Sequence, residues 1–453
     1  MRTDMTQLME KEPAARAVIR LALPMMLAMI AQMVYNMTDT FFIGQTGDPN
    51  MVAGISLTMP LFMVSQGIGN IFAVGSASYI SRKLGEKNTA EARHTNAASF
   101  YTTIGFGLVI TAVLLVFKTP ILHLIGTSEA TFPYADSYFT VITWFMVFAV
   151  VNIGLSGQIR SEGATGKAMK GMLLGIIANI VLDPVFILLL DWGVAGAAWA
   201  TIIGQIASVG YFIRHFTSKH TILSIKVRDC KPNAVMYKEI LKIGVPAALS
   251  HIIMTFCAIL TNIIAASYGD FVVAGGGISM RVTSISFMLI MALAQGFQPF
   301  AGYNYGARNY TRLRQGLKVT LLYTTSLACF FLVVFFAAGP ALITLFIRDE
   351  PTVRAGTSLI RAFVWGLPFM GIQMTFMVTF QALGKPVLAT VVTLGRQFLF
   401  YLPLLFILNH FWQFNGYIYS QPAADMLTSI VALALSSVIF REMHGQSSAA
   451  EIL

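Results

Sequence analysis

Charged residues are scarce in this chain. Of its 453 residues only 11% are Asp, Glu, Lys or Arg, whereas 56% are hydrophobic. A soluble domain carries about 25% charged residues, and no soluble core needs this much apolar sequence. The shortage of charge therefore excludes an ordinary soluble protein, and we expect most of the chain to lie in lipid.

Cysteine is also rare, and the signatures of common enzymes are missing. Cys230, Cys257 and Cys329 form no CxxC pair, and the seven His residues form no ligand-spaced cluster, so we expect neither a disulfide framework nor a structural metal site. The sequence has no HExxH and no GxSxG, and SEGATGKA lacks the first glycine of a P-loop. We therefore expect no enzymatic activity, no cofactor, and no metal beyond Na+ as a coupling ion.

The net charge of +10 does not indicate a nucleic-acid partner. The basic residues lie between apolar runs, where they are typical of cytoplasmic loops of a membrane protein. The N-terminal segment is polar and shows no cleavage site, so we expect no signal peptide.

Long apolar runs are what the sequence has in abundance. A membrane-spanning helix needs roughly 20 mostly apolar residues, and about twelve such runs follow one another along the chain. The pattern predicts an all-α integral membrane protein. We place the spans near 17–44, 52–81, 95–117, 134–159, 170–190, 193–213, 240–267, 272–302, 317–338, 355–383, 387–410 and 414–440.

Positive charge alternates from loop to loop. One set of loops holds most of the Lys and Arg, and the opposite set holds only Lys118, Arg348 and Arg354. Because basic loops stay in the cytoplasm, this bias predicts that both termini are cytoplasmic. The basic loop residues are Arg82, Lys83, Lys87, Arg93, Arg160, Lys167, Lys170, Lys219, Lys226, Arg228, Lys231, Lys238, Arg308, Arg312, Arg314 and Lys385.

The two halves of the sequence resemble each other at a nearly constant offset, which indicates an internal duplication. Six spans in each half give two six-helix repeats of the same orientation, related by an axis along the membrane normal. We assign 1–213 to an N-terminal lobe, 214–239 to a cytoplasmic linker, and 240–453 to a C-terminal lobe and tail. The matching pairs are Leu23-Pro24 with Val245-Pro246, Val52-Ala53-Gly54 with Val273-Ala274-Gly275, Gly75…Gly85-x-x-Asn88 with Gly296…Gly306-x-x-Asn309, and Gly166-Lys167 with Gly384-Lys385.

Two aspartates lie inside apolar spans of the first half. Asp39 shares one helical face with Gln32 and Asn36, beside Tyr35, and Asp183 follows Asn179 by one turn. A carboxylate in hydrocarbon is costly, so it usually marks an ion or substrate path. Carboxylate and amide oxygens suit Na+ or a proton relay. The alternative is a polar cluster that only bonds helices together.

Two prolines accompany these aspartates as hinge candidates. Pro184 directly follows Asp183, and Pro24 lies in the first span. A proline frees the carbonyl four residues back, which allows a kink or an ion contact, although prolines are also common in membrane helices.

The second half carries different charges at membrane depth, namely Arg281, Arg396 and Asp425. Either an arginine neutralises Asp425 in a structural pair, or Asp425 serves substrate binding or coupling. By the repeat offset, Asp39 falls opposite the Thr261/Asn262 region and Asp183 opposite Tyr401. Neither counterpart is a carboxylate, so we assign the aspartate site to the first half only.

The sequence resembles the MATE (multidrug and toxic compound extrusion) family over nearly its whole length, from about residue 15 to 440. The similarity depends on five segments taken together: LALPMMLAMIAQMVYNMTDTFFIG, QGIGNIFAVGSASYISRKLGEKN, EGATGKAMK, NIVLDPVFILLLDWGVAGAAWAT and QGFQPFAGYNYGARN. The prokaryotic branch with aspartates in spans 1 and 5 is most similar. The resemblance implies two six-helix lobes forming a V, alternating access, and export of amphipathic, often cationic drugs against H+ or Na+.

Carried over to this sequence, the resemblance implies a cation site at Asp39, Asn179, Asp183 and Thr201. Bending of the first helix at Pro24 is a switch proposed for the family. The resemblance also implies a multi-pass protein of a prokaryotic plasma membrane, contacting membrane lipids, and we expect a monomer. The alternative function is a flippase for lipid-linked sugar precursors, which would need cationic residues for a pyrophosphate; Arg281 and Arg396 are the candidates.

Overall fold

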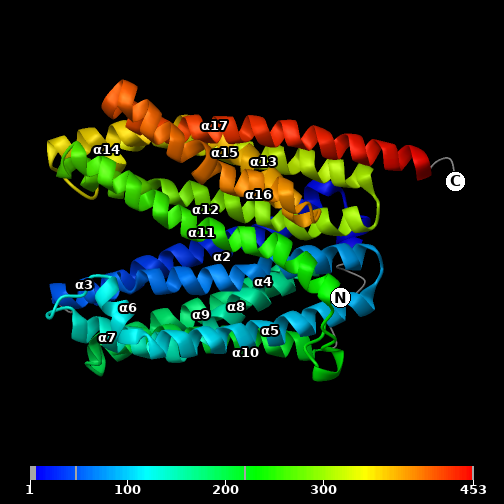
Figure 1. The fold of residues 1–453 in the computed structure, drawn as a ribbon, viewed down its shortest axis with the longest axis horizontal. Helices are drawn as coiled ribbons and strands as arrows, with labels where there is room; N and C mark the ends of the chain where they lie inside the picture. Colours follow the sequence, from blue (N-terminus) through cyan, green and yellow to red (C-terminus); the bar gives the residue numbers. More distant parts are fainter. Residues whose placement is uncertain (1–6, 46–47, 219–220, 451–453) are drawn as a thin grey trace. The chain divides into compact units, whose positions relative to one another are not determined.

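A computed structural model describes residues 7–45, 48–218 and 221–450, and these residues form helices and no strand (Figure 1). The helices of the first half are connected by short turns. They are α2 (Ala14–Gly44), α3 (Pro49–Leu57), α4 (Met59–Gly85), α5 (Thr89–Val116), α6 (Lys118–Leu124), α7 (Phe132–Trp144), α8 (Met146–Ser161), α9 (Thr165–Pro184), the π-helix η1 (Val185–Leu189) and α10 (Gly193–Thr217).

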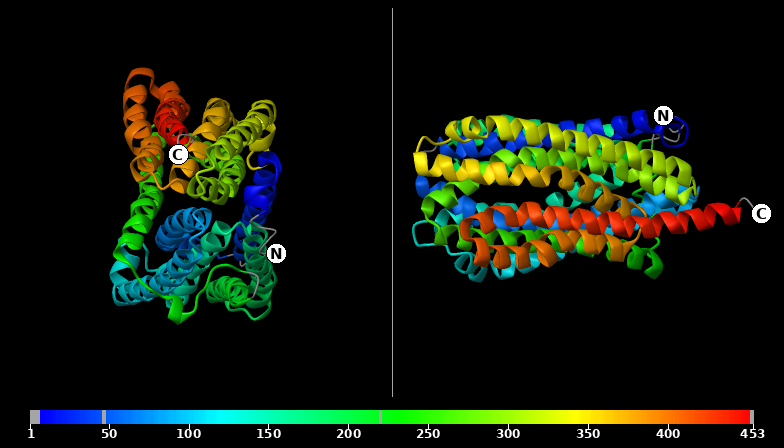
Figure 2. Two further views of the ribbon diagram at one scale, coloured as in Figure 1. Left: turned by 90° about the vertical axis from the view of Figure 1, so that its right-hand side faces the viewer. Right: turned by 90° about the horizontal axis from the view of Figure 1, so that it is seen from above.

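The second half begins after the short 3₁₀ turn η2 (Val227–Asp229). Among its long helices, α12, α13, α15 and α17 pack against one another, and their axes are roughly aligned whichever way the chain runs (Figures 1 and 2). The elements are α11 (Ala234–Ser267), α12 (Asp270–Gly306), α13 (Tyr310–Thr344), α14 (Glu350–Phe363), the 3₁₀ turn η3 (Val364–Gly366), α15 (Leu367–Ala382), α16 (Pro386–Leu394), the π-helix η4 (Gly395–Tyr401) and α17 (Leu402–Ala450).

Among the described residues, nine helices are long and apolar enough to cross a membrane, or up to ten when the bent pair α7–α8 counts as one span. The count of nine differs from the expected twelve at three places, of which the bent pair α7–α8 is one. The expected span 52–81 is broken into α3 and α4 at Thr58. The last two expected spans, 387–410 and 414–440, lie in one continuous helical stretch (Pro386–Arg441), but they are two helices separated by a sharp kink at Gln413 (φ 47°, ψ −129°).

The chain folds into two compact units whose limits do not follow the repeats. Unit 1 consists of Met1–Lys11 and Leu27–Ala248, and unit 2 of Glu12–Met26 and Leu249–Leu453. The start of α2 therefore packs within unit 2, and the start of α11 packs within unit 1. The lobe boundaries expected from the sequence remain a prediction.

Helix boundaries repeat at a constant offset of 221 residues. Asn88 caps α5 by accepting the Glu91 backbone N–H, and Asn309 caps α13 in the same way from Arg312. One expected pair needs correction. Gly163 (φ 84°) ends the turn before α9, and its counterpart Gly384 (φ 68°) ends the turn before α16. The repeat of Gly384 is thus Gly163 and not Gly166, because the glycine that matters is the one whose left-handed backbone ends the preceding helix.

The segment between the repeats is bound to unit 1. Glu162, at the end of α8, is almost fully buried; its Oε2 accepts the Thr221 hydroxyl (2.8 Å) and the Ile222 N–H (3.1 Å). Its Oε1 lies 2.6 Å from Nε2 of His215 on α10. Three side chains of α5 then bond successive linker carbonyls: Arg93 to Ile222, Asn96 to Ser224 and Tyr101 to Ile225.

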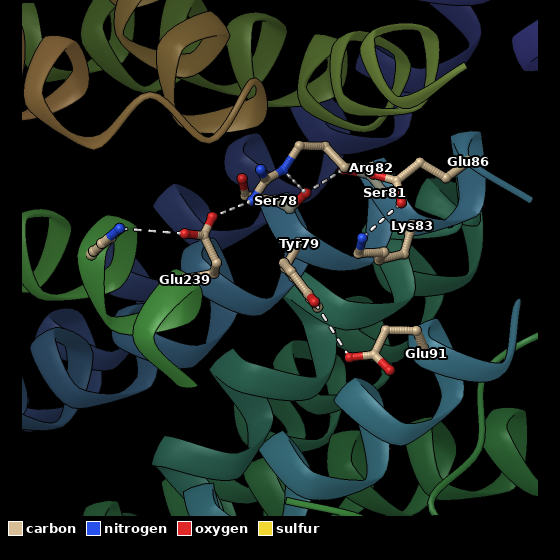
Figure 3. Close-up of polar contacts among 9 residues, drawn as sticks. Ser78, Tyr79, Ser81, Arg82, Lys83, Glu86, Glu91 and Glu239 are labelled. Carbon is tan, nitrogen blue, oxygen red and sulfur yellow. Dashed lines mark hydrogen bonds and ion pairs between the residues drawn. The ribbon is translucent and has the colours of Figure 1, made fainter. Parts of the chain in front are cut away.

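The start of α11 is held in unit 1 by a polar cluster on α4 (Figure 3). Arg82 donates to Glu239 at 3.3 Å, and Glu239 also pairs with Lys242 at 3.5 Å. Tyr79 donates to Glu91 at 3.3 Å, which ties α4 to α5. Beneath this cluster, the backbones of Gly75 and Ile240 touch, since a Cβ on Gly75 would lie 2.3 Å from the Ile240 carbonyl oxygen.

Candidate functional site

The two aspartates predicted from the first half belong to one cluster in unit 1. Asp183, near the end of α9, is fully buried, and Asp39, on α2, is half-buried. Their charges interact electrostatically. The cluster therefore brings together two carboxylates from spans that are far apart in the sequence.

Asn179 and Thr201 connect α9 to α10 at this cluster. The amide orientation that satisfies every neighbour has Asn179 Nδ2 donating to Asp183 Oδ2 at 3.0 Å. Asn179 Oδ1 then accepts the Thr201 backbone N–H at 3.0 Å and the Thr201 hydroxyl at 3.3 Å. Both residues are at most 5% exposed. The four residues implied by the family resemblance thus lie together.

Two tyrosines complete the surroundings of the carboxylates. The Tyr35 hydroxyl lies 3.5 Å from Thr201 Oγ1. Tyr138, on α7, is 4% exposed and interacts electrostatically with Asp39, Tyr35 and Asp183. Nothing in the sequence singles out Tyr138, because its span has no acidic or amide residue at helical spacing from it.

Glycines explain how α9 and α10 approach closely enough to form the site. A Cβ on Gly175 would lie 2.7 Å from the Gly204 carbonyl oxygen, and a Cβ on Gly204 would lie 2.5 Å from that of Gly175. Any other residue would therefore separate the helices. Pro184 then ends α9, and the π-helix η1 follows directly. Such π segments are frequent at functional sites.

One oxygen of each carboxylate has no hydrogen-bond donor among the described residues. Asp39 Oδ1 and Asp183 Oδ1 are buried and accept no hydrogen bond within the described part of the chain. Burying such an acceptor without a donor costs free energy. Together with the hydroxyl and amide oxygens nearby, they form a hard-oxygen environment that suits a small monovalent cation or a proton.

The other residues predicted in α2 lie apart from these contacts. Gln32 donates to Asn36 Oδ1 at 3.3 Å, and Asn36 is exposed. Pro24 lies inside α2, which continues through it as one helix. Their roles in substrate binding or as a hinge remain predictions.

In unit 2, Arg396 is the arginine that meets Asp425. Arg396 Nε donates to Asp425 Oδ1 at 2.7 Å, whereas the Arg281 side chain is exposed on α12. The two counterparts expected for the aspartates also bond each other, since Thr261 Oγ1 and Tyr401 Oη are 2.6 Å apart. The second half therefore holds a neutral hydroxyl pair and a separate ion pair.

Comparison with known proteins points to one family. The family model MatE matches the chain twice, at residues 24–185 and 246–407. The chain is 32% identical to the multidrug export protein MepA of Staphylococcus aureus over 435 residues, covering 96% of each. Its fold matches the outward-facing structure of a multidrug resistance MATE family transporter of the MOP superfamily with a TM-score of 0.91 at 25% identity, covering 97% of this chain and 98% of that one. A MOP superfamily transporter from Pyrococcus furiosus, described as having a binding pocket of reverse polarity, matches equally well, with the same score, identity and coverage.

Proposed function

Since this chain belongs to the MatE family, we propose that it exports multiple drugs across the membrane by antiport against H+ or Na+. The family match and the relation to MepA over nearly the whole chain support drug export. The substrates we propose are amphipathic and often cationic small molecules. The protein is a multi-pass membrane protein of the MATE fold and not an enzyme.

The observation that carries the coupling proposal is the pair of carboxylates, each with one buried oxygen that lacks a donor among the described residues. Asp39 and Asp183 bind the coupling cation, and Asn179 and Thr201 orient Asp183 through the hydrogen bonds between them. Antiport follows if the cation and the drug each favour a different conformation of the transporter. Pro24 and Pro184 are the proposed hinges.

The experiment is dye efflux from inside-out vesicles, with a proton gradient and a Na+ gradient imposed separately. We expect only one of the two gradients to drive transport of a cationic dye, and the ion of that gradient is then the coupling ion. Asp39→Asn and Asp183→Asn should each abolish gradient-driven movement while size-exclusion behaviour stays unchanged. Efflux at the unmutated rate in both variants would refute coupling through these carboxylates.

The flippase alternative finds less support in the geometry. A pyrophosphate would need free cationic side chains, yet Arg396 already pairs with Asp425. Only Arg281 of the two candidates is exposed. Transport of a lipid-linked sugar, but of no cationic dye, would favour the flippase instead.

We further propose a prokaryotic plasma-membrane location with both termini in the cytoplasm, as the distribution of Lys and Arg indicates. A monomer in lipid contact suffices for the proposed cycle, because both repeats are present in one chain. Labelling of single cysteines placed in the loops of the expected two sides tests this topology.

A further inference from the structure

The hydrogen bonds of Asp425 are distributed unevenly between its two oxygens. Oδ1 accepts three donors: Arg396 Nε at 2.7 Å, Gln373 Nε2 at 2.9 Å and Gln421 Nε2 at 3.3 Å. Oδ2 is buried and accepts none in the described part of the chain, and the same holds for Gln373 Oε1. Asp425 and Gln373 are at most 1% exposed. Unit 2 thus contains a buried carboxylate site with free acceptor oxygens, as unit 1 does.

Three irregular backbone segments surround this carboxylate. Arg396 lies in the π-helix η4, and Gly366 ends the 3₁₀ turn η3 so close that a Cβ on it would lie 3.0 Å from Asp425 Oδ2. Pro422 lies three residues before Asp425 in α17. Helix irregularities of this kind concentrate at functional sites, and here they allow an arginine and a carboxylate from different helices to meet inside unit 2.

Arg396 is a cation fixed in this site. Its side chain is 12% exposed, that of Asp425 is 1% exposed, and the guanidinium also stacks 5.6 Å from the Phe287 ring centre. Arginine remains charged under all ordinary conditions. The other titratable group that faces Asp425 is Tyr401, also from η4. From α15 and α17 the described contacts add only neutral amides, those of Gln373 and Gln421.

The site in unit 1 has no such internal cation. Among the described residues, neither Asp39 nor Asp183 forms a salt bridge, and Asn179, Thr201, Tyr35 and Tyr138 contribute only neutral groups there. A buried carboxylate must be neutralised by a bound cation, by a proton or by a neighbouring charge. The carboxylates of unit 1 therefore need a cation or proton from solution to neutralise them, whereas Asp425 of unit 2 is neutralised by Arg396 of the same unit.

We propose that Arg396 is a tethered counter-ion that occupies the carboxylate site of unit 2, so that H+ or Na+ from solution loads the unit 1 site only. The inference depends on the proposed function, because it assigns the coupling cation to one of two buried carboxylate sites. Its consequence is specific: removing the charge of Arg396 opens a second cation site at Asp425.

The test uses the full-length Asp39→Asn/Asp183→Asn variant, in which the unit 1 site has lost both carboxylates and so can no longer bind a cation. Binding of ²²Na+ and uptake of protons are measured on the purified protein in nanodiscs. We expect no cation binding at these sites in that variant. Adding Arg396→Gln should create binding of about one Na+ or proton per chain, the amount that neutralises one carboxylate.

Two matched variants in the same background identify the source of the new binding. Arg396→Gln/Asp425→Asn should abolish it, because no carboxylate remains, and Arg396→Lys should not show it, because the charge remains. If Arg396→Gln does not fold, Arg396→His replaces it, and binding should then appear only above the pH at which the imidazole beside Asp425 loses its charge.

The outcomes separate this inference from the proposed function. Failure of the unmutated protein to bind any cation, together with new binding in Arg396→Gln, would refute the coupling site in unit 1 and leave the role of Arg396 as the counter-ion of Asp425 standing. A folded Arg396→Gln variant that binds no cation would overturn the inference. Asp425-dependent binding in the Asp39→Asn/Asp183→Asn variant with Arg396 intact would overturn it as well.

Discussion

His215 and Glu162 form a buried pair that joins the end of α10 to the end of α8, with Nε2 and Oε1 2.6 Å apart. The other carboxylate oxygen of Glu162 holds the first described residues of the linker, Thr221 and Ile222. The loop sequence EGATGKA resembles a degenerate phosphate-binding motif, but its glutamate has a structural role. Its glutamate attaches the segment between the repeats to unit 1.

Replacing Glu162 should release the linker. Glu162→Ala leaves His215, the Thr221 hydroxyl and the Ile222 N–H without their common partner, and each buried polar group that loses its partner costs about 1–3 kcal/mol. We expect trypsin to cleave after Lys226 and Arg228 faster than in the unmutated protein. Glu129→Ala, at an exposed loop position, is the control. Equal cleavage rates for the two variants would contradict the anchoring role.

The contact between α9 and α10 should tolerate no side chain. Gly175→Ala places a methyl group about 2.7 Å from a carbonyl oxygen of α10, and such overpacking costs about 1–3 kcal/mol. Gly210→Ala adds the same methyl group to α10 where nothing lies within 4 Å. We expect a lower melting temperature in detergent and lost efflux for the first variant only. Unchanged melting of Gly175→Ala would show that the helices can separate without cost.

Thr201 should contribute to cation affinity through its hydroxyl. Thr201→Val keeps the backbone N–H bonded to Asn179 but removes the hydroxyl near Asn179 and Tyr35. The loss of one such bond is about 1 kcal/mol, so we expect roughly fivefold weaker activation of efflux by the coupling cation. Thr217→Val, at the exposed end of the same helix, should have no effect. Identical cation dependence in both variants would remove Thr201 from the site.

The loop between α2 and α3 should be sensitive to acid. Hydrogen bonds from the Tyr134 hydroxyl (2.6 Å) and the Asn50 N–H (2.8 Å) lower the pKa of Asp48. A carboxyl whose pKa is lowered by folding stabilises the protein above its unfolded pKa, and this contribution disappears as the pH falls through the folded pKa.

Tyr134→Phe removes the larger of these two effects on the pKa of Asp48. We expect it to lower the melting temperature at about pH 7 and to have progressively less effect as the pH falls through the folded pKa of Asp48, below which the carboxyl is protonated in both states. Melting curves measured across this pH range test this. A larger effect of the substitution at the lower pH would contradict the assigned direction.

The sequence alone singles out part of the candidate site. Asp39 and Asp183 stand out because carboxylates are rare in apolar spans, and the structure places them in one cluster. Thr201 follows only from the family resemblance, because one threonine in an apolar helix carries no signal of its own. Tyr138 could not be foreseen, since its contribution depends on how the fold brings α7 near Asp39 and Asp183.

The register of the repeat shows a similar limit. The GK dipeptides at Gly166 and Gly384 look equivalent in sequence, yet the structure pairs Gly384 with Gly163. The shared Gly-Lys dipeptide is a coincidence, whereas a glycine with positive φ is physically required where the preceding helix ends. Likewise, the sequence offers both Arg281 and Arg396 as partners of Asp425, and only the packing of η4 against α17 selects Arg396.

The exchange of helix segments between the two units bears on how such a protein could have arisen. Unit 1 contains residues 234–248 from the second repeat, and unit 2 contains residues 12–26 from the first. A single repeat therefore lacks part of the packing of either unit. An ancestor encoding one repeat would have needed a second copy of itself, with the leading segments swapped between the copies. Gene fusion would then have made a swapped dimer permanent within one chain.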